Sequence, residues 1–511
     1  MKNSAYWLIV IILIAVFLRF WDLKNTPPGF WLDEAMNGTN AIQAIEISGW
    51  KVFYQENFGR EGLFINIQAL FVKTFGHEPW VLRLPSVIFG LLTVLGLYFL
   101  TKELFSGRVS LFASFFLATS FWHINFSRIG FRAIMAPFFL VWAFYFLFLG
   151  MRKQKEWIFT SAGFTFGLGF HTYIAYRAAP IIAFLPFWSF YKSWREDTGR
   201  PLGRPVSKHC APCLIGLFIF MAFLAALPLL WYYAQNPADF LGRTSAISVF
   251  KSSNPLGQFS ENLVKTLGMF NFAGDFNWRH NLAGSPQLWW PVGILFLIGI
   301  FGALRSSVFP RNAYNFILLW FIVMILPVAF SNESLPHALR AIVLIPPAMI
   351  FAALGLDWLW RNVRPRLRIF IYIFLVTAAI QAYSQYFLRW APNFNVYQAF
   401  HTDITEKARW LNKQPNDIKK YVITDAVDRV DTTGTPMSFQ PIIFITDTAT
   451  PAKQTRKNIY YASLQNISSA NCSQKCLFVP VEYQPSIFKI IKQKIPGLRL
   501  DASSGFVVLK K

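Results

Sequence analysis

Two adjacent carboxylates, Asp33 and Glu34, lie in the segment PPGFWLDEAMNG, which follows the first apolar run of the chain. Acidic residues are scarce, since 25 Asp and Glu stand against 48 Lys and Arg. A pair of carboxylates suits proton abstraction or metal binding. The structural alternative is that Asp33 caps a helix predicted over EAMNGTNAIQAIEI, because the PPG turn comes just before it.

Further polar side chains recur in the same loop and in four later segments. The set comprises Glu61, His77, Arg128, Arg132, His171, Tyr173, Arg177, Asp275, Arg279, His280, His337 and Arg340. Guanidinium groups bind phosphate through paired hydrogen bonds and keep their charge. With the carboxylates, they describe a group transfer in which a phosphate leaves and a carboxylate activates an incoming hydroxyl. In a membrane, we expect that phosphate to be attached to a lipid.

Most residues of this set also have a structural interpretation. The alternatives are lipid-head anchoring for Arg128, Arg132 and Arg177, core packing for His77 and His171, and ion pairing for Glu61, Asp275, Arg279 and His280. The case for function rests on placement, because the topology predicted from the basic loops brings all these segments to the outer side. Ionisable residues at or below a membrane interface are costly, so we predict one extracytoplasmic site.

Apolar helices must position these residues. Of the 511 residues, 54% are hydrophobic and 14% are charged, which is typical of polytopic membrane proteins. About eleven apolar runs approach the ~20 residues that a helix needs to cross a bilayer. Three cover 6–20, 87–100 and 109–122, and the others centre near residues 142, 165, 183, 222, 297, 321, 350 and 377. The first run lacks a small-residue cleavage site, so we interpret it as a retained helix.

The net charge of +23 is concentrated in short loops at alternate helix ends. These loops include residues 152–155, 192–208 and 361–368. The positive-inside rule then places the N-terminus in the cytoplasm and, with an odd number of crossings, the C-terminus outside. We therefore expect a multi-pass protein of the inner or plasma membrane whose basic loops face lipid head groups, with no nucleic-acid partner.

The composition becomes more polar from residue 391. We predict a membrane body over 1–390, with outer loops at about 22–79 and 234–289, and a small extracytoplasmic α/β domain over 391–511. In that domain, HTDITEKARWLNKQ predicts a helix with Asp403 and Glu406 at capping-box spacing. The segments KYVITDAV, PIIFITDT, CLFVPVEY and GFVVLKK predict short strands.

The four cysteines form two close pairs in the sequence. Cys210 and Cys213 would supply only half of a zinc site, so we interpret them as incidental thiols. Cys472 and Cys476 lie in the region predicted to be outside, where a disulfide could form.

Several of these segments match a known family. The chain resembles the bacterial GT-C glycosyltransferases of the protein O-mannosyltransferase type, which include the aminoarabinose transferase acting on lipid A. The resemblance covers about residues 5–390. It rests on PPGFWLDEAMNG, RLPSVIFGLLTVLGLYFL, SRIGFR, YIAYRAAP, GDFNWRHN with GSPQLWWPVGILFLIG, and LPHALRAIVLIPP. The first of these segments is the most specific.

The resemblance implies an inverting glycosyltransferase with the GT-C fold. Its donor is a sugar on a polyprenyl phosphate, and its acceptor is an extracytoplasmic hydroxyl of a protein, lipid or cell-envelope glycan. Asp33, with Glu34 beside it, matches the acid of the first loop that deprotonates the acceptor. Negative charge there would also stabilise an oxocarbenium-like transition state.

The resemblance also implies where the donor phosphate binds. Arg340 and His337 match the motif near the last helices that would hold it, and Arg128 and Arg177 carry charge suited to the same role. The remaining residues are expected to bind or support the substrates: Glu61, His77, Arg132, His171, Tyr173, Asp275, Arg279 and His280.

The sequence departs from the family at two places. Arg132 lies where some relatives have an acid, and GREGLF replaces a His-Pro-Pro segment of the first loop. No cofactor is therefore assigned, and a divalent metal stays open. The alternative function is a transporter or flippase for a lipid-linked or anionic substrate. That class needs charges near the bilayer midplane and broken helices in two matching halves, and the sequence shows neither.

Overall fold

The computed structural model describes residues 4–198, 210–305, 311–425, 430–431, 434–467, 470, 472 and 475–511. The chain divides into two compact units, of which unit 1 comprises residues 1–21 and 86–390. Unit 2 comprises residues 22–85 and 391–511. The first predicted outer loop therefore shares a compact unit with the C-terminal residues. Each unit is described by itself.

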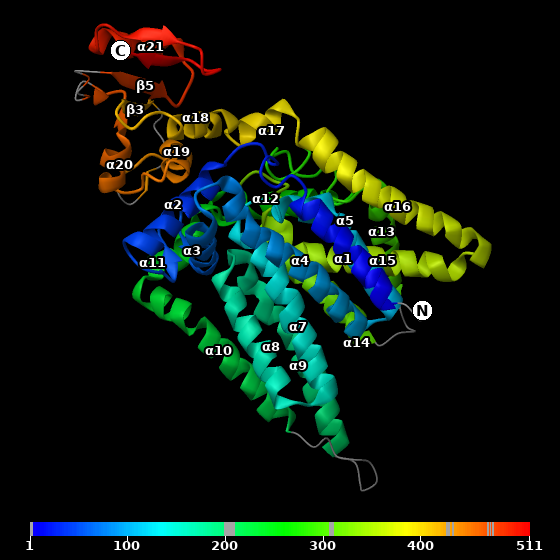
Figure 1. Cartoon of the computed structure of the whole chain (residues 1–511). Coiled ribbons are helices and arrows are strands. Elements are labelled where there is room, and N and C mark those ends of the chain that lie inside the picture. The colour runs from blue at the N-terminus through cyan, green and yellow to red at the C-terminus, as the bar shows by residue number, and fades with distance from the viewer. Residues whose placement is uncertain are drawn as a thin grey trace. The chain divides into compact units, whose positions relative to one another are not determined.

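Unit 1 is built from apolar helices, many of which run side by side (Figure 1). They are α1 (Ser4–Phe20), α4 (Pro79–Leu104, whose first turns belong to unit 2), α5 (Gly107–Thr119), α7 (Met135–Lys153), α8 (Glu156–Leu168), α9 (Ala179–Thr198), α10 (Ala211–Gln235), α13 (Trp290–Arg305), α14 (Arg311–Ala329), α15 (Ile345–Asn362) and α16 (Ile369–Tyr383). Each apolar run predicted from the sequence coincides with one of them. The connections carry the shorter helices α6 (Phe121–Phe126), α11 (Pro237–Ala246) and α12 (Pro255–Gly268).

Five helical stretches among the described residues are long and apolar enough to cross a membrane. They are Pro79–Leu104, Arg132–Lys153, Ala211–Gln235, Arg340–Asn362 and Pro365–Trp390. The other predicted crossings fall on shorter or more polar helices, such as Ser4–Phe20 and Trp290–Arg305. The body is thus mostly helical, as a membrane-spanning protein requires, because lipid offers no hydrogen-bond partners to irregular backbone.

Glycines let α13 and α15 approach each other closely. A Cβ added at Gly299 of α13 would collide with the carbonyl oxygen of Phe351 in α15. A Cβ at Gly355 of α15 would likewise collide with the carbonyl oxygen of Leu295 in α13. Gly302, one turn further along α13, faces open space. Small residues are the usual means of packing helices in lipid, so Gly299 and Gly355 fix this helix pair.

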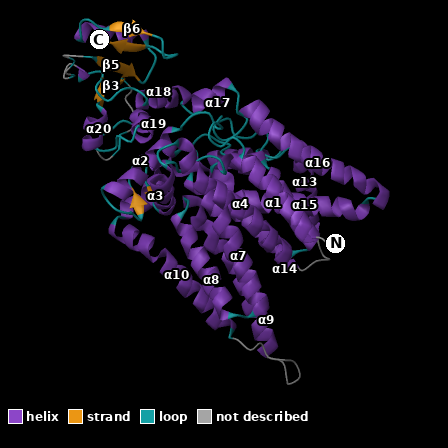
Figure 2. Ribbon diagram, in the orientation of Figure 1, coloured by secondary structure: helices purple, strands orange, loops and turns teal. Residues whose placement is uncertain are grey.

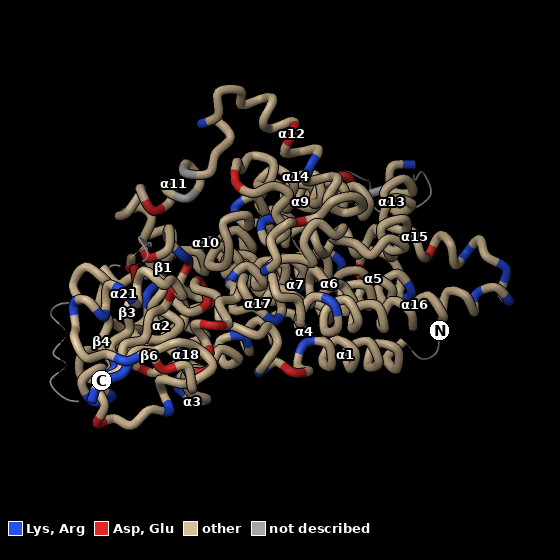
Figure 3. Tube along the Cα trace, turned by 90° about the horizontal axis from the view of Figure 1, so that it is seen from above, with Lys and Arg blue, Asp and Glu red and all other residues tan. Residues whose placement is uncertain are grey.

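Charged residues of unit 1 gather at helix ends. Lys and Arg cluster at the turn between α15 and α16, where Arg361 is followed by the 3-10 turn Pro365–Arg368 (Figure 3). Asp357 is buried in α15 and forms ion pairs with Arg108 and Arg361. The two guanidinium groups offset the cost of burying this carboxylate. Residues 199–209 of the predicted basic loop lie outside the described residues.

Unit 2 contains a five-stranded mixed sheet in the order β4-β3-β5-β7-β6 (Figure 2). The strands are β3 (Lys419–Thr424), β4 (Ile459–Ser463), β5 (Cys476–Pro480), β6 (Arg499–Asp501) and β7 (Val508–Lys510). β3 pairs in parallel with β4 and β5, whereas β7 pairs antiparallel with β5 and β6. The helices are α2 (Leu32–Glu46), α3 (Leu63–Phe75), α17 (Phe394–Ala399), α18 (Thr402–Asn412), α19 (Gln440–Ile445), α20 (Pro451–Lys457) and α21 (Pro485–Lys494). A short hairpin joins β1 (Phe53–Tyr54) to β2 (Arg60–Glu61).

One apolar core joins the two chain segments of unit 2. Ala41 and Ile42 of α2 belong to the same cluster of buried side chains as Ile442 and Phe444 of α19. A Cβ added at Gly38 of α2 would lie 2.6 Å from the Phe444 ring, so only glycine fits at this contact. Residues near the start of the chain and residues near its end therefore build one interior.

The segment PIIFITDT, predicted as a strand, forms α19 instead. All six residues of α19 are buried, and a short buried run cannot be assigned to helix or strand by periodicity alone. Its proline lies in the first turn, where a helix needs no N–H donor. The predicted capping box is also wrong, because α18 begins at Thr402 with His401 as its N-cap. The other three predicted strands are present as β3, β5 and β7.

Both cysteine pairs form disulfides. Cys472 is joined to Cys476, and Cys210 is joined to Cys213. The interpretation of Cys210 and Cys213 as incidental thiols is therefore wrong. Over the described residues, no cysteine is left as a free thiol.

Candidate functional site

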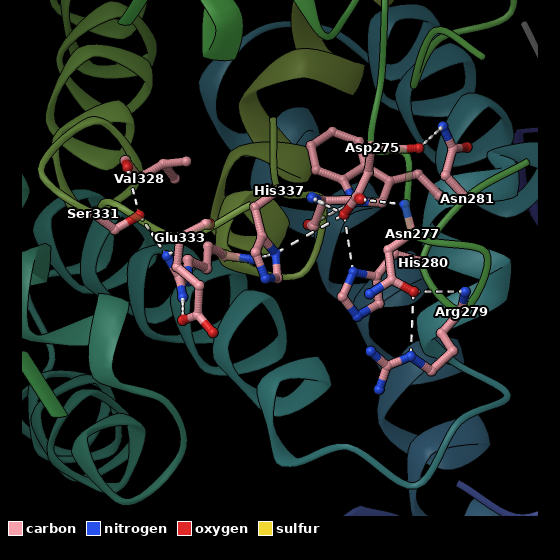
Figure 4. A network of polar contacts seen from close by, with 12 residues as sticks. Asp275, Asn277, Arg279, His280, Asn281, Val328, Ser331, Glu333 and His337 are labelled. Carbon is pink, nitrogen blue, oxygen red and sulfur yellow. Dashed lines mark hydrogen bonds and ion pairs between the residues drawn. The ribbon is translucent and has the colours of Figure 1, made fainter. Parts of the chain in front are cut away.

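Asp275 is the centre of a buried polar network in unit 1 (Figure 4). It lies in the connection between α12 and α13 and is 2% exposed. Its Oδ2 accepts hydrogen bonds from His280 Nδ1 at 2.9 Å and from the backbone N–H of Ala338 at 2.8 Å. Its Oδ1 accepts from the backbone N–H of Asn277 at 2.8 Å. This one carboxylate thus joins the loop before α13 to the loop before α15.

His337 lies in the second of these loops and faces the same carboxylate. Its Nδ1 lies 3.9 Å from Asp275 Oδ2 and 3.4 Å from the backbone nitrogen of Arg340. The ring centroids of His337 and His280 are 5.0 Å apart. Two imidazoles and one carboxylate therefore meet at a place from which water is largely excluded.

Arg340 lies in the same loop as His337 and extends the network further. Its side chain is largely buried and donates to Ser331 Oγ at 2.6 Å. The guanidinium also forms an ion pair with Glu333, whose side chain is 47% exposed. The Arg340 guanidinium is thus largely shielded from water, whereas the carboxylate of Glu333 is exposed to solvent.

Arg279 lies in the loop before α13, next to His280. Its Nε donates to Asn277 Oδ1 at 3.2 Å, and its carbonyl oxygen accepts from Asn125 Nδ2 at 2.7 Å. Asn125 belongs to α6, so this loop is tied to the helix that follows α5. Of the three residues considered as an ion-paired turn, Asp275 and His280 are joined by a hydrogen bond that lies inside a larger network.

In unit 2, the two carboxylates of the first loop have different surroundings. Glu34 is fully buried, and Arg83 donates to it from Nε at 3.3 Å and from Nη2 at 3.4 Å. Arg83 also donates to the carbonyl oxygens of Pro27 and Gly29, so it ties the PPG turn to the start of α2. Asp33 is partly exposed. The α2 N-cap is Trp31, so Asp33 lies within the first helical turn and is not the cap.

Glu61 and Arg60 form the second strand of the β1–β2 hairpin and are both buried. Arg60 Nη1 and Nη2 donate to Asn37 Oδ1 and Asn40 Oδ1, each at 2.5 Å. The guanidinium also lies 3.8 Å from the carboxylate of Glu56. The hairpin is therefore fastened to the buried face of α2, two turns from its N-terminal end.

His77 is partly buried between α3 and α4. Its Nε2 lies 3.5 Å from Asp447 Oδ1. Burial lowers the pKa of His77 below its ordinary value of 6.5, although Asp447 acts in the opposite direction. Lys453 pairs with Asp447 at 2.6 Å and with Glu46 at 2.5 Å. These charges link the first loop to the C-terminal residues inside unit 2.

Arg128 is fully buried in unit 1, near the end of α1. Its guanidinium donates to the carbonyl oxygens of Leu18, Arg19 and Trp21 at 2.7–3.2 Å. Carbonyl groups at a helix end have no partner within the helix, so this arginine completes the last turn of α1.

The remaining candidates of unit 1 contact other parts of that unit. The guanidinium of Arg132 lies 5.8 Å from the centroid of the Tyr173 ring. Arg177 donates to Tyr233 Oη at 3.0 Å, and His171 Nε2 donates to a backbone carbonyl of α10 at 2.9 Å. The contacts of Arg177 and His171 hold the connection between α8 and α9 against α10.

Two buried arginines with a positioning role were missed in the sequence. Arg83 holds Glu34, and Arg19 donates to Ser127 Oγ at 3.3 Å and lies 2.8 Å from His123 Nδ1. Both arginines are fully buried. The available signal was a single charge inside an apolar run, which is costly unless it has a specific partner.

The predicted residues fall into three groups within the two units. The network around Asp275 brings together Asp275, Arg279, His280, His337 and Arg340 in unit 1. Arg128, Arg132, His171, Tyr173 and Arg177 have contacts elsewhere in unit 1, and Asp33, Glu34, Glu61 and His77 belong to unit 2. Among the residues that the structure describes, Asp275, His280 and His337 form a group that could hold a metal ion, because one ligand atom from each lies within 4.8 Å of the others.

Comparison with solved structures defines the fold. ArnT from Cupriavidus metallidurans in the apo state has a TM-score of 0.60 at 11% identity, covering 99% of this chain and 98% of ArnT. The same protein bound to undecaprenyl phosphate has a TM-score of 0.59 at 12% identity, with the same coverage. The apo oligosaccharyltransferase of Archaeoglobus fulgidus has a TM-score of 0.50 at 14% identity, covering 90% of this chain and 64% of that protein. The chain is a multi-pass, mostly helical membrane protein with an ArnT-like fold.

Sequence comparison agrees with this fold. The profile of the dolichyl-phosphate-mannose-protein mannosyltransferase family matches residues 63–231. A candidate mannosyltransferase of Bacillus subtilis (strain 168), YkcB, is 28% identical over 191 residues, which are 35% of this chain and 26% of YkcB. The chain thus spans about a quarter of the curated relative that it matches. The resemblance to GT-C glycosyltransferases of the protein O-mannosyltransferase type is confirmed.

Proposed function

We propose that the protein is a membrane glycosyltransferase that moves a sugar from a polyprenyl-phosphate donor to a hydroxyl of an extracytoplasmic acceptor. The observation that carries this proposal is the fold similarity to ArnT along 99% of the chain, joined to the family match over residues 63–231. Undecaprenyl phosphate is bound in one ArnT structure, and it supplies the donor class for the proposal. The acceptor is a protein, a lipid or a cell-envelope glycan.

Asp33 acts in this proposal as the general base that deprotonates the acceptor hydroxyl. The hydroxyl oxygen then attacks the anomeric carbon, the bond to the lipid phosphate breaks, and the configuration inverts. The partial exposure of Asp33 supports this role, because a base must reach the proton that it removes. Glu34 is held by Arg83 and is therefore assigned to positioning the start of α2.

Arg340 acts in this proposal on the leaving phosphate. Its ion-pair partner Glu333 is about half exposed, so an incoming phosphate can replace that carboxylate at little cost. A guanidinium that is largely shielded from water stabilises the negative charge that develops on a leaving phosphate. His337, three residues before Arg340, is the second group of the same loop assigned to the phosphate.

The proposal includes a topology. About eleven helices cross the membrane, the N-terminus lies in the cytoplasm, and the loops that carry Asp33 and Arg340 lie outside. The basic turn between α15 and α16 supports a cytoplasmic location for that end of unit 1. Cysteine labelling of single sites in intact cells tests this orientation, because externally added reagents react only with outer positions.

Release of polyprenyl phosphate is the direct test of the activity. Purified full-length protein in lipid is supplied with radiolabelled polyprenyl-phosphate sugars and a cell-envelope extract. We expect wild type to release polyprenyl phosphate and Asp33→Asn to fall below about one hundredth of that rate, which is typical for loss of a general base. The label should appear in one class of acceptor.

Asp403→Asn is the matched control, because Asp403 is also the second residue of a helix in unit 2. The two substitutions remove the same charge from equivalent helix positions, so a general effect on helix stability would appear in both. Equal turnover by Asp33→Asn and Asp403→Asn would contradict the role of Asp33. No release with any donor by folded wild type would contradict the transferase itself.

A further inference from the structure

We propose that Asp275, His280 and His337 bind a divalent transition-metal ion, with Zn²⁺ as the preferred species. The three residues come from the loop before α13 and the loop before α15, both in unit 1 (Figure 4). The ion would join these two loops through its ligands. This proposal stands on unit 1 alone and does not depend on the transferase proposal.

The spacing of the ligand atoms fits one ion. His280 Nδ1 and His337 Nδ1 lie 2.9 Å and 3.9 Å from the same carboxylate oxygen of Asp275. One atom from each of the three residues lies within 4.8 Å of the others. Metal–ligand bonds of ~2.0–2.1 Å in a tetrahedral site place neighbouring ligand atoms about 3.3 Å apart. The observed separations lie on both sides of that value, so small side-chain rotations close the site.

A cation between Asp275 and His337 would lie next to a buried carboxylate. The backbone N–H of Arg340 lies 3.4 Å from His337 Nδ1, a long contact that would be replaced when this nitrogen binds the ion. Asp275 Oδ2, 3.9 Å from the same nitrogen, carries only lone pairs when ionised. A positive charge between these atoms would offset the charge of the buried Asp275 carboxylate. A metal ion supplies that charge and replaces the proton between His280 and Asp275.

The donor set selects the kind of ion. Two imidazole nitrogens and one carboxylate oxygen suit Zn²⁺ and similar transition metals, whereas Mg²⁺ prefers a shell of oxygen atoms. Three protein ligands leave a fourth position for water or for an anionic ligand. Thiolates do not compete, because Cys210, Cys213, Cys472 and Cys476 are all in disulfides.

The neighbouring charges are compatible with a cation. Arg340 is close to His337 in the chain, but its guanidinium is paired with Glu333. Arg279 points its Nε at Asn277 Oδ1 in the same loop. The ion would fix the loop that carries Arg340, so metal binding would also set the position of this guanidinium.

Metal content of the purified protein tests the proposal. Full-length protein carrying a tag without histidine is stripped with a chelator, loaded with Zn²⁺ and separated from unbound metal by gel filtration. We expect about one Zn²⁺ per wild-type chain and less than about a tenth of that in His337→Gln and His280→Gln. His171→Gln is the matched control, because His171 is a buried histidine of unit 1 outside the cluster, and it should keep the wild-type content.

A second measurement separates metal loss from misfolding. Zn²⁺ should raise the unfolding temperature of wild type and of His171→Gln, whereas Mg²⁺ should not. His337→Gln, which keeps the Asp275 contacts to Ala338 and Asn277, should unfold cooperatively and show no shift with Zn²⁺. Wild-type protein that retains no Zn²⁺, or a folded His337→Gln variant that retains as much as wild type, would overturn the proposal.

Discussion

Glu34→Gln should destabilise unit 2 strongly, because it leaves the Arg83 guanidinium buried without its counter-charge. Both side chains are fully buried, and the two residues are joined by hydrogen bonds of 3.3 and 3.4 Å. Removing one partner of a buried ion pair costs about 3–5 kcal/mol. Glutamine has nearly the same shape as glutamate, so the loss measures charge and not packing.

Hydrogen exchange of the α2 amides is the suitable assay, because unfolding of a membrane protein in detergent is seldom two-state. A loss of about 3–5 kcal/mol corresponds to exchange that is faster by about 10²–10⁴-fold. The control is Glu78→Gln, which removes a carboxylate from the exposed pair with Arg409 at 3.2 Å in the same unit. An exposed pair contributes about 0–1 kcal/mol, so exchange should change by less than about fivefold.

The double variant tests the coupling between the two charges. Replacing Glu34 by Gln and Arg83 by Met together should cost less than the sum of the two single changes, because no charge is then left unpaired. Some loss should remain, since Arg83 also donates to the carbonyl oxygens of Pro27 and Gly29. Additive effects, or unchanged exchange in Glu34→Gln, would refute the argument that this pair holds the start of α2.

Three further predictions concern the packing of α13, the pH dependence of stability and the binding of the donor. Gly299→Val should lower, by roughly 5 °C or more, the temperature at which the detergent-solubilised protein loses its monodisperse peak in size-exclusion chromatography, whereas Gly302→Val on the same helix should not. The pKa of His77 is below 6.5 in the folded chain, so the unfolded chain takes up the proton first and stability falls as the pH drops through about 6.5. His77→Gln should remove this contribution, and an unchanged pH profile of the unfolding temperature would contradict it. Arg340→Lys should raise the KM for the polyprenyl-phosphate donor about tenfold, because a lysine cannot bind phosphate through paired donors.

The apolar helices and three of the four predicted strands were predictable from the sequence. Long apolar runs indicate membrane helices, and short segments rich in β-branched and aromatic residues indicate strands. The segment PIIFITDT was not predictable, since a short buried run is compatible with either state. The helix over 32–46 was anticipated from 34–47, but its first turn was not, so Asp33 was considered as a cap. Helix ends depend on tertiary contacts, here the arginine at position 83 and the turn that it holds.

The sequence predicted which residues of the candidate site lie on one side of the membrane, but not the role of each residue. The sequence assigned Asp275, His280, His337 and Arg340 to one face through the predicted topology, and the structure places them in one network. It could not distinguish the roles of Asp33 and Glu34, because adjacent residues of a helix point in different directions and only packing decides which one is buried. Arg128 was assigned to a ligand on charge alone, yet its donors contact the last carbonyl groups of α1.

The shared core of α2 and α19 imposes an order on the synthesis of this protein. Residues 22–85 leave the ribosome early, whereas Ile442 and Phe444, which complete their apolar interior, are made after about 350 intervening residues. Until then α2 packs against α3 of the same segment but lacks its later partner, α19. Synthesis that stops near residue 390 would therefore yield a protein with all its membrane helices and an uncovered face around Gly38, a substrate for chaperones and proteases. The folding of the first loop is thus complete only after α19, near the other end of the chain, has been made.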